Sequence, residues 1–393
     1  MTTPAPKPGK DSIRILHTAD WHLGREFHGR DLSSLHQAFF DWLANEIEVL
    51  QVDLLIMAGD IFDRALPPLA AIELLNRELA RMADLCEVVL VTGNHDSTIR
   101  MSHGPLMRSG IHLRSGTTGL GIPIIPAAAG FPLAIYPIPY LDPGSAAEAL
   151  GVDEARQEPV IRAAIDRSLN DLSDRPGSRS VAIGHAFILG GEESDSERPI
   201  SMGGSDRVPA AAFEGFDYTA LGHLHRAQES GKAIRYSGSP IPLSFSEVGA
   251  GLGKSVNVVD LPAEGPIEVE VVPVPQLVEM ARISGTLDEL LSSDDFSSLT
   301  DAWLEITLTD ERRPDQPMER LRSRFENVIS LRFESQISDG TDDDPRHLTE
   351  IARVDPIKLI ESFIEHVRGA GPDPEEEKVL KQALASRAAE ESR

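Results

Sequence analysis

The stretch Asp53-Leu54-Leu55-Ile56-Met57-Ala58-Gly59-Asp60-Ile61-Phe62-Asp63 places an apolar strand directly before a glycine and an aspartate. The unbroken apolar run from 54 to 58 predicts a buried strand. Gly59 allows the backbone to approach a neighbouring segment closely just before Asp60. In open α/β sheets the functional residues follow the carboxyl ends of such strands. We therefore predict an α/β fold with Asp60 at its functional edge.

Four further blocks place polar residues after apolar strands in the same way. The predicted strands cover residues 13–17, 53–58, 88–92, 180–183 and 218–221. Large apolar residues at helical spacing predict helices over 32–50 and 69–85, so we expect a sheet covered by helices on both faces. The further blocks are Asp20-Trp21-His22, Gly93-Asn94-His95-Asp96, Gly184-His185 and Gly222-His223-Leu224-His225.

Together, the five blocks offer carboxylates, an amide oxygen and imidazoles as ligands. Any one of these blocks by itself is more often a hydrogen-bonded surface feature than a ligand pair. Packing demands alone, however, do not explain five such strand ends in one chain. The combined donor set is about what two divalent cations sharing a bridging carboxylate need. The pattern therefore predicts a metal-dependent hydrolase.

Length and composition bound the class of protein. The 393 residues exceed the size at which a single core usually stops growing, about 250–300 residues, so at least two folded units are expected. The sequence has no apolar run long enough to span a bilayer and no secretory signal at its start, and Cys86 is its only cysteine. We expect a cytoplasmic protein.

The net charge of -26 is unfavourable for direct nucleic-acid binding, which normally needs clustered Lys and Arg. Residues 261–393 hold 30 acidic and 15 basic side chains, so -15 of this charge lies in the last third. Bound cations would neutralise part of the remainder. A generally acidic composition selected for solubility is an equally good explanation of this balance.

The sequence pattern changes after Gly238-Ser239-Pro240. Residues 255–259 and 267–271 predict an antiparallel pair, 273–275 a linker, and 277–336 a strand-helix-strand-helix-strand unit. Two amphipathic helices, 356–368 and 374–389, follow an acidic linker. The expected parts are an N-terminal arm 1–12, a main domain 13–274, an α+β domain 275–338, an acidic linker 339–354 and a helical tail 355–393.

The order Asp-x-His, Gly-Asp-x-x-Asp, Gly-Asn-His-Asp, Gly-His, Gly-His-x-His resembles the calcineurin-like metallophosphoesterase superfamily. Within it, segments 18–24, 59–63, 190–199 and 220–226 resemble the SbcD family of bacterial exonuclease subunits, the counterparts of the archaeal and eukaryotic Mre nucleases. The match continues through 236–240 and 244–247 and covers nearly the whole chain. It implies a four-layer α/β fold, a β-sandwich flanked by helices, with a small α+β capping domain and a helical tail.

The resemblance implies two metal ions and assigns their ligands. Asp20, His22, Asp60 and His225 would hold one ion. Asp60, Asn94, His185 and His223 would hold the other, so that Asp60 is the bridge. Oxygen and imidazole donors without thiolate suit Mn²⁺ and also admit Fe²⁺, Zn²⁺ or Mg²⁺, and the family favours Mn²⁺. Two such ions, about 3.5–4 Å apart, would activate a hydroxide for attack on a phosphodiester.

His95 is the imidazole left over from the ligand set. In the family this histidine is thought to protonate the leaving oxygen, a role that suits a group titrating near neutral pH. Asp96 would either hold the His95 ring or cap a following helix. Archaeal and eukaryotic relatives usually carry a second histidine where this chain has Asp63, and we assign Asp63 a supporting role around the metals. We expect no catalytic role for the histidines outside the blocks.

The resemblance also implies the substrate and the partners. The family's activities are ATP-dependent exonuclease action on duplex ends and endonuclease action on single strands and hairpins, in DNA repair and recombination. The partner would be an SbcC-type ATPase with a long coiled coil, bound through the tail, within a heterotetramer that contains a homodimer of this chain formed through about 69–85 and 97–109. Candidate DNA contacts are Arg25, Arg64, Arg198 and Arg226, which are equally well explained as solvated arginines. Candidate partner contacts, chosen by helical spacing, are Leu359, Phe363 and Val367.

Two alternatives remain open, one from the same superfamily and one from another class of protein. The chain could be a different enzyme of the superfamily that acts on nucleotides or phosphoproteins. Against this, Asp96 stands where protein phosphatases usually have Glu, and a small-molecule esterase does not need the appended unit and helices. The chain could instead be a non-catalytic scaffold that keeps its metals for structure. Against that, His95 is present although a purely structural site would not need it.

Overall fold

The computed structural model describes residues 9, 11–102, 108–197, 207–247, 253–334, 371–372 and 376–380. The chain divides into two compact units, Met1–Glu334 and Ser335–Arg393, and the first contains the fold that positions the site. Within the described ranges, none of the helices combines the length and the apolar character needed to cross a membrane.

The first sheet of the sandwich has six strands in the order β15-β14-β1-β4-β5-β6. Strands β1, β4, β5 and β6 pair in parallel, whereas β14 pairs antiparallel with both β1 and β15. The strands are β1 (Ser12–Thr18), β4 (Leu54–Ala58), β5 (Glu87–Val91), β6 (Ile111–Arg114), β14 (Ser255–Pro262) and β15 (Glu268–Pro273). Two helices, α1 (Ser33–Leu50) and α2 (Leu69–Ala83), connect the first three of these strands.

The second sheet has five strands in the order β12-β13-β11-β8-β7. Strands β7, β8, β11 and β13 pair in parallel, and β12 is an antiparallel edge. The strands are β7 (Leu133–Ile138), β8 (Arg179–His185), β11 (Tyr218–Gly222), β12 (Gln228–Gly231) and β13 (Ile234–Tyr236). The helices α3 (Pro143–Leu150) and α4 (Gln157–Ser173) connect β7 to β8.

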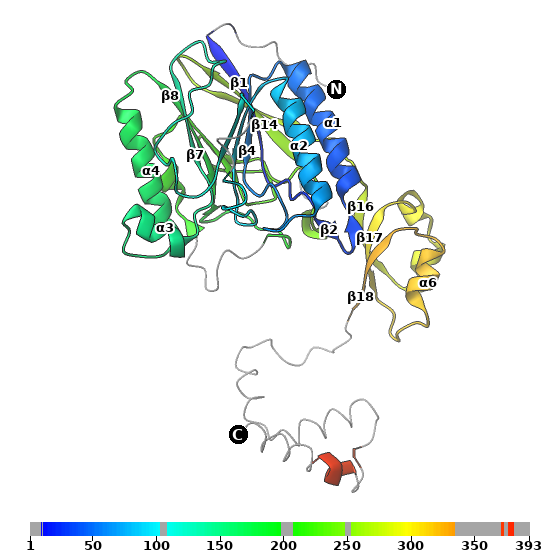
Figure 1. Ribbon diagram of the computed structural model, residues 1–393. Coiled ribbons are helices and arrows are strands. Elements are labelled where there is room, and N and C mark those ends of the chain that lie inside the picture. Colours follow the sequence, from blue (N-terminus) through cyan, green and yellow to red (C-terminus); the bar gives the residue numbers. More distant parts are fainter. Residues whose placement is uncertain are drawn as a thin grey trace. The chain divides into compact units, whose positions relative to one another are not determined.

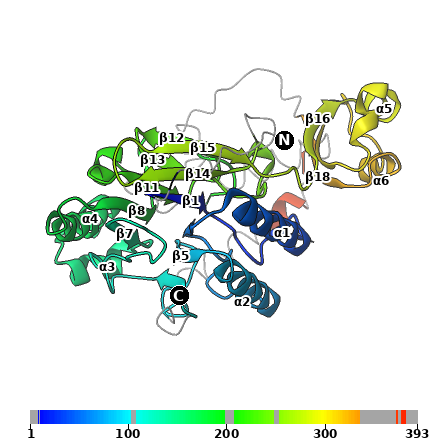
Figure 2. The ribbon, with the colours of Figure 1, turned by 90° about the horizontal axis from the view of Figure 1, so that it is seen from above.

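Three hydrophobic cores give the sandwich its layers. Leu54, Ile56 and Ala58 of β4 face the second sheet, and the alternate residues Leu55 and Met57 face α1 and α2. This alternation follows from the two-residue period of a strand. A third core joins α3 and α4 to the outer face of the second sheet. Figures 1 and 2 show the result, with α1 and α2 on one side of the two sheets and α3 and α4 on the other.

This four-layer arrangement confirms the fold that the family resemblance implies. The simpler expectation from the strand pattern, one sheet with helices on both faces, is wrong, because each sheet has helices on its outer face alone and the other sheet on its inner face. The expected linker at 273–275 is also wrong in part. Strand β15 extends to Pro273, and Val274 is buried in the core beneath α1.

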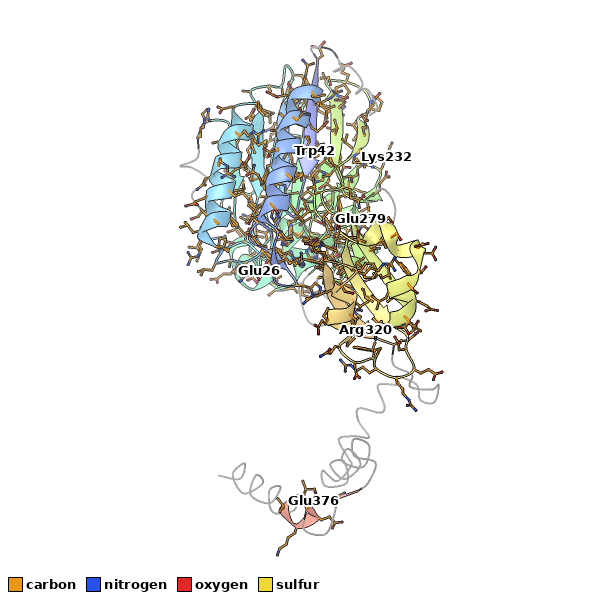
Figure 3. The ribbon with its side chains drawn as sticks, turned by 90° about the vertical axis from the view of Figure 1, so that its right-hand side faces the viewer. Glu26, Trp42, Lys232, Glu279, Arg320 and Glu376 are labelled. Carbon is orange, nitrogen blue, oxygen red and sulfur yellow. The ribbon has the colours of Figure 1, made fainter. Side chains whose placement is uncertain are left out.

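The α+β unit has its own small sheet and core. Its parallel strands β16 (Met280–Gly285), β17 (Trp303–Leu308) and β18 (Val328–Phe333) are joined by α5 (Leu287–Ser292), η4 (Asp294–Leu299) and α6 (Pro317–Arg322). Thr286 begins α5 with a capping box, in which its hydroxyl accepts from the Glu289 N–H while the Glu289 carboxylate accepts from the Thr286 N–H. Figure 3 labels Arg320 on α6 in this unit and Trp42 on α1 in the sandwich.

Short elements of the sandwich hold the α+β unit in place. Phe27 of β2 (Glu26–Phe27) stacks on Trp303, with ring centroids 5.7 Å apart and planes 13° apart. Arg30 of β3 (Arg30–Asp31) donates to the Asn327 side-chain oxygen at 2.8 Å. The remaining short elements of the sandwich lie around the second sheet and the site. They are β9 (Phe187–Ile188), β10 (Arg207–Val208), η2 (Ala210–Phe213) and η3 (Phe245–Glu247).

Candidate metal centre

The predicted ligands converge at the carboxyl ends of both sheets. Asp20, Asp60 and Asn94 follow β1, β4 and β5 of the first sheet. His185 ends β8 and His223 follows β11 of the second sheet. The loops after β1 and β4 are tied by backbone hydrogen bonds, from the Asp20 N–H to the Gly59 carbonyl and from the His22 N–H to the Asp60 carbonyl, each 3.0 Å long. Both sheets therefore supply residues to the same site.

Glycines allow the two sheets to come this close. A Cβ on Gly59 would lie 2.1 Å from His185 Nδ1, and a Cβ on Gly222 would lie 1.7 Å from the Ala58 carbonyl oxygen. Neither contact is sterically possible. The blocks also hold non-glycine residues in the left-handed region, with φ of 55° at Asp20 and 52° at Asp60. Such conformations cost free energy and are concentrated at functional sites.

The first cluster contains Asp20, His22 and His225, all buried. Each offers a donor atom within 4.8 Å of the other two. The two imidazoles face each other, with His22 Nε2 3.0 Å from His225 Nε2. The Asp20 carboxylate accepts from the His223 N–H at 3.0 and 3.1 Å, which fixes its orientation.

The second cluster contains Asp60, His185 and His223, again all buried and within 4.8 Å of one another. Asn94 joins it, because its amide oxygen lies 2.9 Å from His185 Nε2 and 3.3 Å from His223 Nδ1. His185 is oriented by its other ring nitrogen, Nδ1, which contacts the Ala58 carbonyl oxygen at 3.0 Å.

Asp60 lies between the two clusters. Its Oδ2 is 3.6 Å from His22 Nε2 in the first and 3.5 Å from His185 Nε2 in the second. Its Oδ1 accepts from the His95 N–H at 2.9 Å. One carboxylate thus faces both sets of donors, which is the position that a bridging ligand requires.

Burial and mutual charge set the protonation of these groups. Burial lowers the pKa of His22 to about 3, so that its ring is neutral at physiological pH. Burial also opposes the charge on Asp60, but His185 outweighs it and holds the pKa of that carboxyl well below its usual range. Asp60 in turn raises the pKa of His185 to about 9 against the effect of burial. In the chain alone, a proton on His185 therefore compensates Asp60, as a cation would.

This donor chemistry fits divalent cations. The clusters contain imidazole nitrogens, carboxylates and an amide oxygen, a set that suits borderline and hard metal ions. The second buried carboxylate, Asp20, has its pKa raised to about 7 by burial. A bound cation would offset the cost of ionising it. The fit therefore rests on the buried carboxylates as well as on the spacing of the donors.

His95 and Asp63 border the clusters. His95 Nδ1 contacts the Asp63 backbone carbonyl at 2.7 Å, and because a carbonyl only accepts, Nδ1 carries a proton. His95 Nε2 then faces the centre, 3.9 Å from Asp60 Oδ2. The Asp63 carboxylate lies 3.6 Å from His22 Nδ1 and accepts from Arg25 at 3.2 Å. His22, Asp63 and His95 thus form a further cluster of possible donors.

Both expectations for Asp96 are wrong. Its carboxylate accepts from the backbone N–H groups of Ile61, Phe62 and Gly93, at 3.1, 2.9 and 2.9 Å. It does not hold the His95 ring, and residues 97–102 form no helix that it could cap. Its role is to join the loop after β4 to the loop after β5.

The candidate DNA contacts are only partly placed. Arg25 lies against Asp63, and Arg64 has a side chain that is 54% exposed, with Nε 3.9 Å from Asp63 Oδ2. Arg226 donates to the Ser246 carbonyl and lies 3.8 Å from Glu192, so its guanidinium already has protein partners. Arg198 lies outside the described residues, as do the tail positions Leu359, Phe363 and Val367.

Two histidines outside the blocks, His17 and His36, hydrogen-bond to other parts of the protein. His17 contacts the Tyr218 hydroxyl at 2.9 Å and the Leu221 carbonyl at 3.1 Å. His36 donates to the Trp21 carbonyl at 2.7 Å. Both rings tie the first sheet or its helix to the segments that carry the site.

The sequence reasoning missed the residues behind His225. Ser196, Glu247 and Lys254 surround the ring and carbonyl of this histidine. Segments 190–199 and 244–247 contribute to the family resemblance, but apart from the candidate DNA contact Arg198 the sequence indicates no role for their residues. The two segments lie about 50 residues apart, and nothing in the sequence between them indicates a contact. The family resemblance is the one feature of the sequence that marks both segments.

Comparison with known proteins agrees with this geometry. Residues 13–227 match the family model described as calcineurin-like phosphoesterase, and residues 276–368 match the one described as type 5 capsule protein repressor C-terminal domain. The chain is 36% identical over 317 residues to the SbcD subunit of nuclease SbcCD from Escherichia coli K12, covering 76% of this chain and 78% of the relative. It is 35% identical over 401 residues to the same nuclease subunit of Bacillus subtilis 168, covering 96% of this chain and 99% of the relative.

Proposed function

This chain belongs to the calcineurin-like phosphoesterases and, within them, to the family of the SbcD subunit of nuclease SbcCD, and from this premise we propose that it is a Mn²⁺-dependent DNA nuclease. A metal-dependent nuclease is what the family supports, and the choice of Mn²⁺ is the proposal. The observation that supports a two-metal nuclease is the position of Asp60, whose single carboxylate faces the buried donors of both clusters. Imidazole and oxygen donors without thiolate suit Mn²⁺.

We assign the ligands by cluster. Asp20, His22, Asp60 and His225 would hold one ion, and Asp60, Asn94, His185 and His223 would hold the other. The short separations between donors within each group support this division. When bound, two divalent cations lower the pKa of a water for attack on the phosphodiester and stabilise the charge that develops on the phosphate.

His95 would supply the proton for the leaving oxygen. Its Nδ1 is committed to the Asp63 carbonyl, so any proton that the ring exchanges at the centre is on Nε2. Nε2 lies on the side of Asp60, 3.9 Å from its Oδ2, and therefore faces the residues that would hold the metals. Asp63 would support this arrangement through its backbone carbonyl and through its carboxylate beside His22.

Arg25 and Arg64 are the proposed phosphate contacts. Both lie beside Asp63 at the edge of the clusters, and Arg64 has the exposed guanidinium. A forked guanidinium is suited to phosphate oxygens. The chain has 37 Lys and Arg against 63 Asp and Glu, and we infer from this deficit of basic side chains that a partner supplies much of the grip on DNA. The protein would therefore work in the cytoplasm, at the nucleoid.

A surface beside α2 supports the proposed homodimer. A pocket of about 490 Å³ is lined by apolar residues such as Phe62, Leu75 and Met101, together with the polar side chains of Arg64, Asn76, Ser97 and Arg100. Leu66 and Leu69, at the start of α2, are 67% and 69% exposed. Exposed apolar groups of this size on a folded surface commonly mark an interface. Of the second predicted dimer segment, 97–109, the structure describes residues 97–102 and 108–109.

The proposed partner is the coiled-coil ATPase of an SbcCD-type complex, bound through residues 355–393. The names of the relatives support this assignment, and most of the segment lies outside the described residues. We propose that the complex acts as an ATP-dependent exonuclease on duplex ends and as an endonuclease on single strands and hairpins, in repair and recombination.

One experiment tests these proposals together. The chain, purified with and without its ATPase partner, is incubated with linear duplex and single-stranded DNA in Mn²⁺, Mg²⁺ or Zn²⁺. We expect Asp60→Ala to abolish both hydrolysis and metal binding, and Asp41→Ala, which removes an exposed carboxylate of α1, to change neither. Full hydrolysis by Asp60→Ala would exclude the proposed bridge. Deletion of residues 350–393 should abolish partner binding and leave nicking of single strands.

A further inference from the structure

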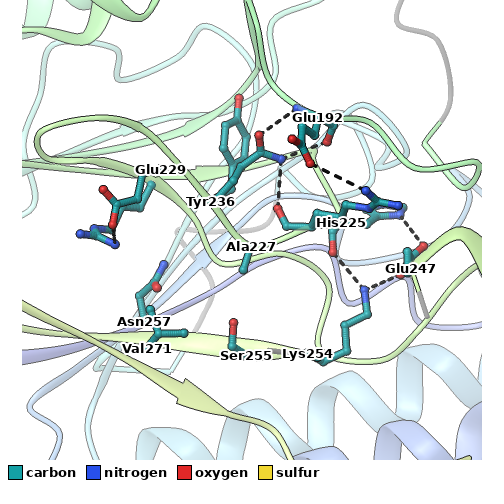
Figure 4. Close-up of a pocket in the computed structure, with 14 residues that line it drawn as sticks. Glu192, His225, Ala227, Glu229, Tyr236, Glu247, Lys254, Ser255, Asn257 and Val271 are labelled. Carbon is teal, nitrogen blue, oxygen red and sulfur yellow. Dashed lines mark hydrogen bonds and ion pairs between the residues drawn. The ribbon is translucent and has the colours of Figure 1, made fainter. Parts of the chain in front are cut away.

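Three hydrogen-bonded side chains, Ser196, Glu247 and Lys254, lie on the Nδ1 side of His225. We call them the His225 relay. His225 Nε2 faces His22, whereas its Nδ1 lies 2.5 Å from Ser196 Oγ. Ser196 Oγ is also 2.5 Å from Glu247 Oε1. Lys254 forms an ion pair with Glu247 and donates to the His225 carbonyl at 3.0 Å, as Figure 4 shows.

The direction of the protons along this relay follows from the partners. The ammonium of Lys254 lies against Glu247, so Glu247 is a carboxylate and can only accept. The proton between Ser196 and Glu247 must then come from the Ser196 hydroxyl. That hydroxyl has no second proton for His225, so the short contact between Ser196 Oγ and His225 Nδ1 needs a proton on Nδ1. The Nε2 lone pair is left facing the first cluster.

We propose that Ser196 and Glu247 are positioning residues that hold His225 in the tautomer whose Nε2 can bind metal. The inference rests on the proposed role of His225 as a ligand. Groups that accept the other N–H of a metal-binding histidine fix its tautomer and orientation. Replacing such a group commonly lowers metal affinity about 10–100-fold. His185 has the simpler form of this arrangement, with Nδ1 at the Ala58 carbonyl. For His225 the same function depends on side chains.

The relay belongs to a clamp between two segments, 194–197 and 244–247. The Asp195 N–H donates to the Ser246 hydroxyl at 2.9 Å, and the Ser194 hydroxyl lies 3.1 Å from Glu247 Oε1. The Glu197 carboxylate accepts from the His225 N–H at 2.7 Å, so the clamp holds the backbone of His225 as well as its ring. Asp195 also lies 3.5 Å from Arg282 of the α+β unit. Segments 194–197 and 244–247 contribute to the family resemblance although they contain none of the proposed ligands, and the clamp explains why they matter for the site.

Two variants test the proton direction. Ser196→Ala removes the acceptor of the Nδ1 proton and should leave a mixture of both His225 tautomers. Glu247→Gln is nearly isosteric but reverses the relay. The Leu243 N–H and Lys254 both donate to Oε2, so the amide oxygen must occupy that position and the amide NH₂ must face Ser196. Ser196 would then donate to His225 Nδ1, and the proton of the ring would move to Nε2.

The matched control is Ser246→Ala, which removes a hydroxyl of the same clamp that has no contact with His225. The tautomer is measured from ¹⁵N shifts of histidine rings in EDTA-treated protein, with His225 assigned by the signal missing from His225→Gln. Mn²⁺ affinity is measured by calorimetry on the full chain, and circular dichroism checks that each variant is folded. Neither readout requires nuclease activity.

We expect Nδ1–H in the wild type and in Ser246→Ala, a mixture in Ser196→Ala and Nε2–H in Glu247→Gln. Mn²⁺ affinity should fall about 10–100-fold in the last two variants, the range typical of such supporting groups. An unchanged tautomer in Glu247→Gln would overturn the proposal, and so would an equal loss of affinity in Ser246→Ala, because the clamp would then act only by rigidity. Unchanged Mn²⁺ affinity in His225→Gln would instead refute the proposed ligand set, whatever the tautomer.

Discussion

Replacing Gly93 by alanine should displace the proposed bridging ligand Asp60 without removing any of the donor groups. The added Cβ would lie 2.1 Å from Asp60 Oδ1 and 2.2 Å from the Asp60 backbone nitrogen. Non-bonded carbon contacts have their optimum at about 3.5–4.0 Å, so Asp60 or the loop after β5 must move by more than about 1 Å. Backbone is involved, so a change of side-chain rotamer cannot relieve the clash.

The expected magnitude follows from that displacement. A misplacement of about 1 Å typically costs about 100-fold in rate, or about 2.7 kcal/mol in the barrier. The strain of overpacking should lower the free energy of unfolding by a further amount of about 1–3 kcal/mol. Gly144→Ala is the control, because that glycine lies inside α3 and its nearest neighbour, Asp142 Oδ1, is 3.4 Å from the added Cβ. Gly144 is the second residue of α3 and far in sequence from the site blocks, so alanine there should leave Mn²⁺ binding and turnover unchanged.

The assay combines Mn²⁺ calorimetry, hydrolysis of single-stranded DNA and chemical denaturation on the same preparations. We expect Gly93→Ala to be folded, to bind Mn²⁺ more weakly and to lose most turnover. In an Asp60→Ala background the same substitution should have no further effect on metal binding. Wild-type affinity and turnover in Gly93→Ala would refute the reasoning, because the close approach of Gly93 to Asp60 would then not matter for the site.

Three further predictions concern the acid, the charges and the dimer. His95→Ala should keep both metals in calorimetry and lose about 10²–10⁴-fold in turnover, the usual contribution of a general acid, whereas full activity would exclude the assigned role. In EDTA, the pKa of His185 is raised to about 9 from 6.5 by Asp60, so its stabilising contribution is complete below about pH 6.5 and is lost as the pH rises to about 9. Thermal melts should show this loss, and His185→Gln should remove it. Leu66→Asp at the apolar surface beside α2 should give monomers in light scattering if that surface forms the homodimer, and Lys232→Asp, a charge change on the loop between β12 and β13, should not.

Local sequence was sufficient to predict the strand ends of the site. The runs that become β4 and β5 are apolar on both faces and are followed by glycine-containing blocks. A few neighbouring residues are therefore enough to predict both the strand and the turn that ends it. The same apolar run does not indicate whether a helix or a second sheet packs on each face of the strand. Leu55 packs against helices and Ile56 against a second sheet, but both are simply large and apolar. This is why the pattern indicated one sheet and only the family resemblance implied two.

Other features depend on contacts between distant segments. Strand β7 contains Pro137, which argues against a central strand, and the structure places it at the edge of the second sheet. Asp96 was expected to act locally, but its donors include N–H groups of Ile61 and Phe62 in another loop. The contact between Ser196 and Glu247 joins segments 51 positions apart. Residue types predicted which groups can act, and folding decided which of them meet.

The division of the clusters between the two sheets also has a consequence for synthesis. The first sheet presents Asp20, Asp60 and Asn94 early in the chain, whereas His185, His223 and His225 belong to the second sheet and emerge from the ribosome much later. Domains generally form from the N-terminus onward during translation. A nascent chain that has not yet reached His223 can hold neither cluster complete, and the first cluster also needs His225. If the proposed ligands are correct, a chain that has not yet reached these histidines cannot hydrolyse DNA through this site.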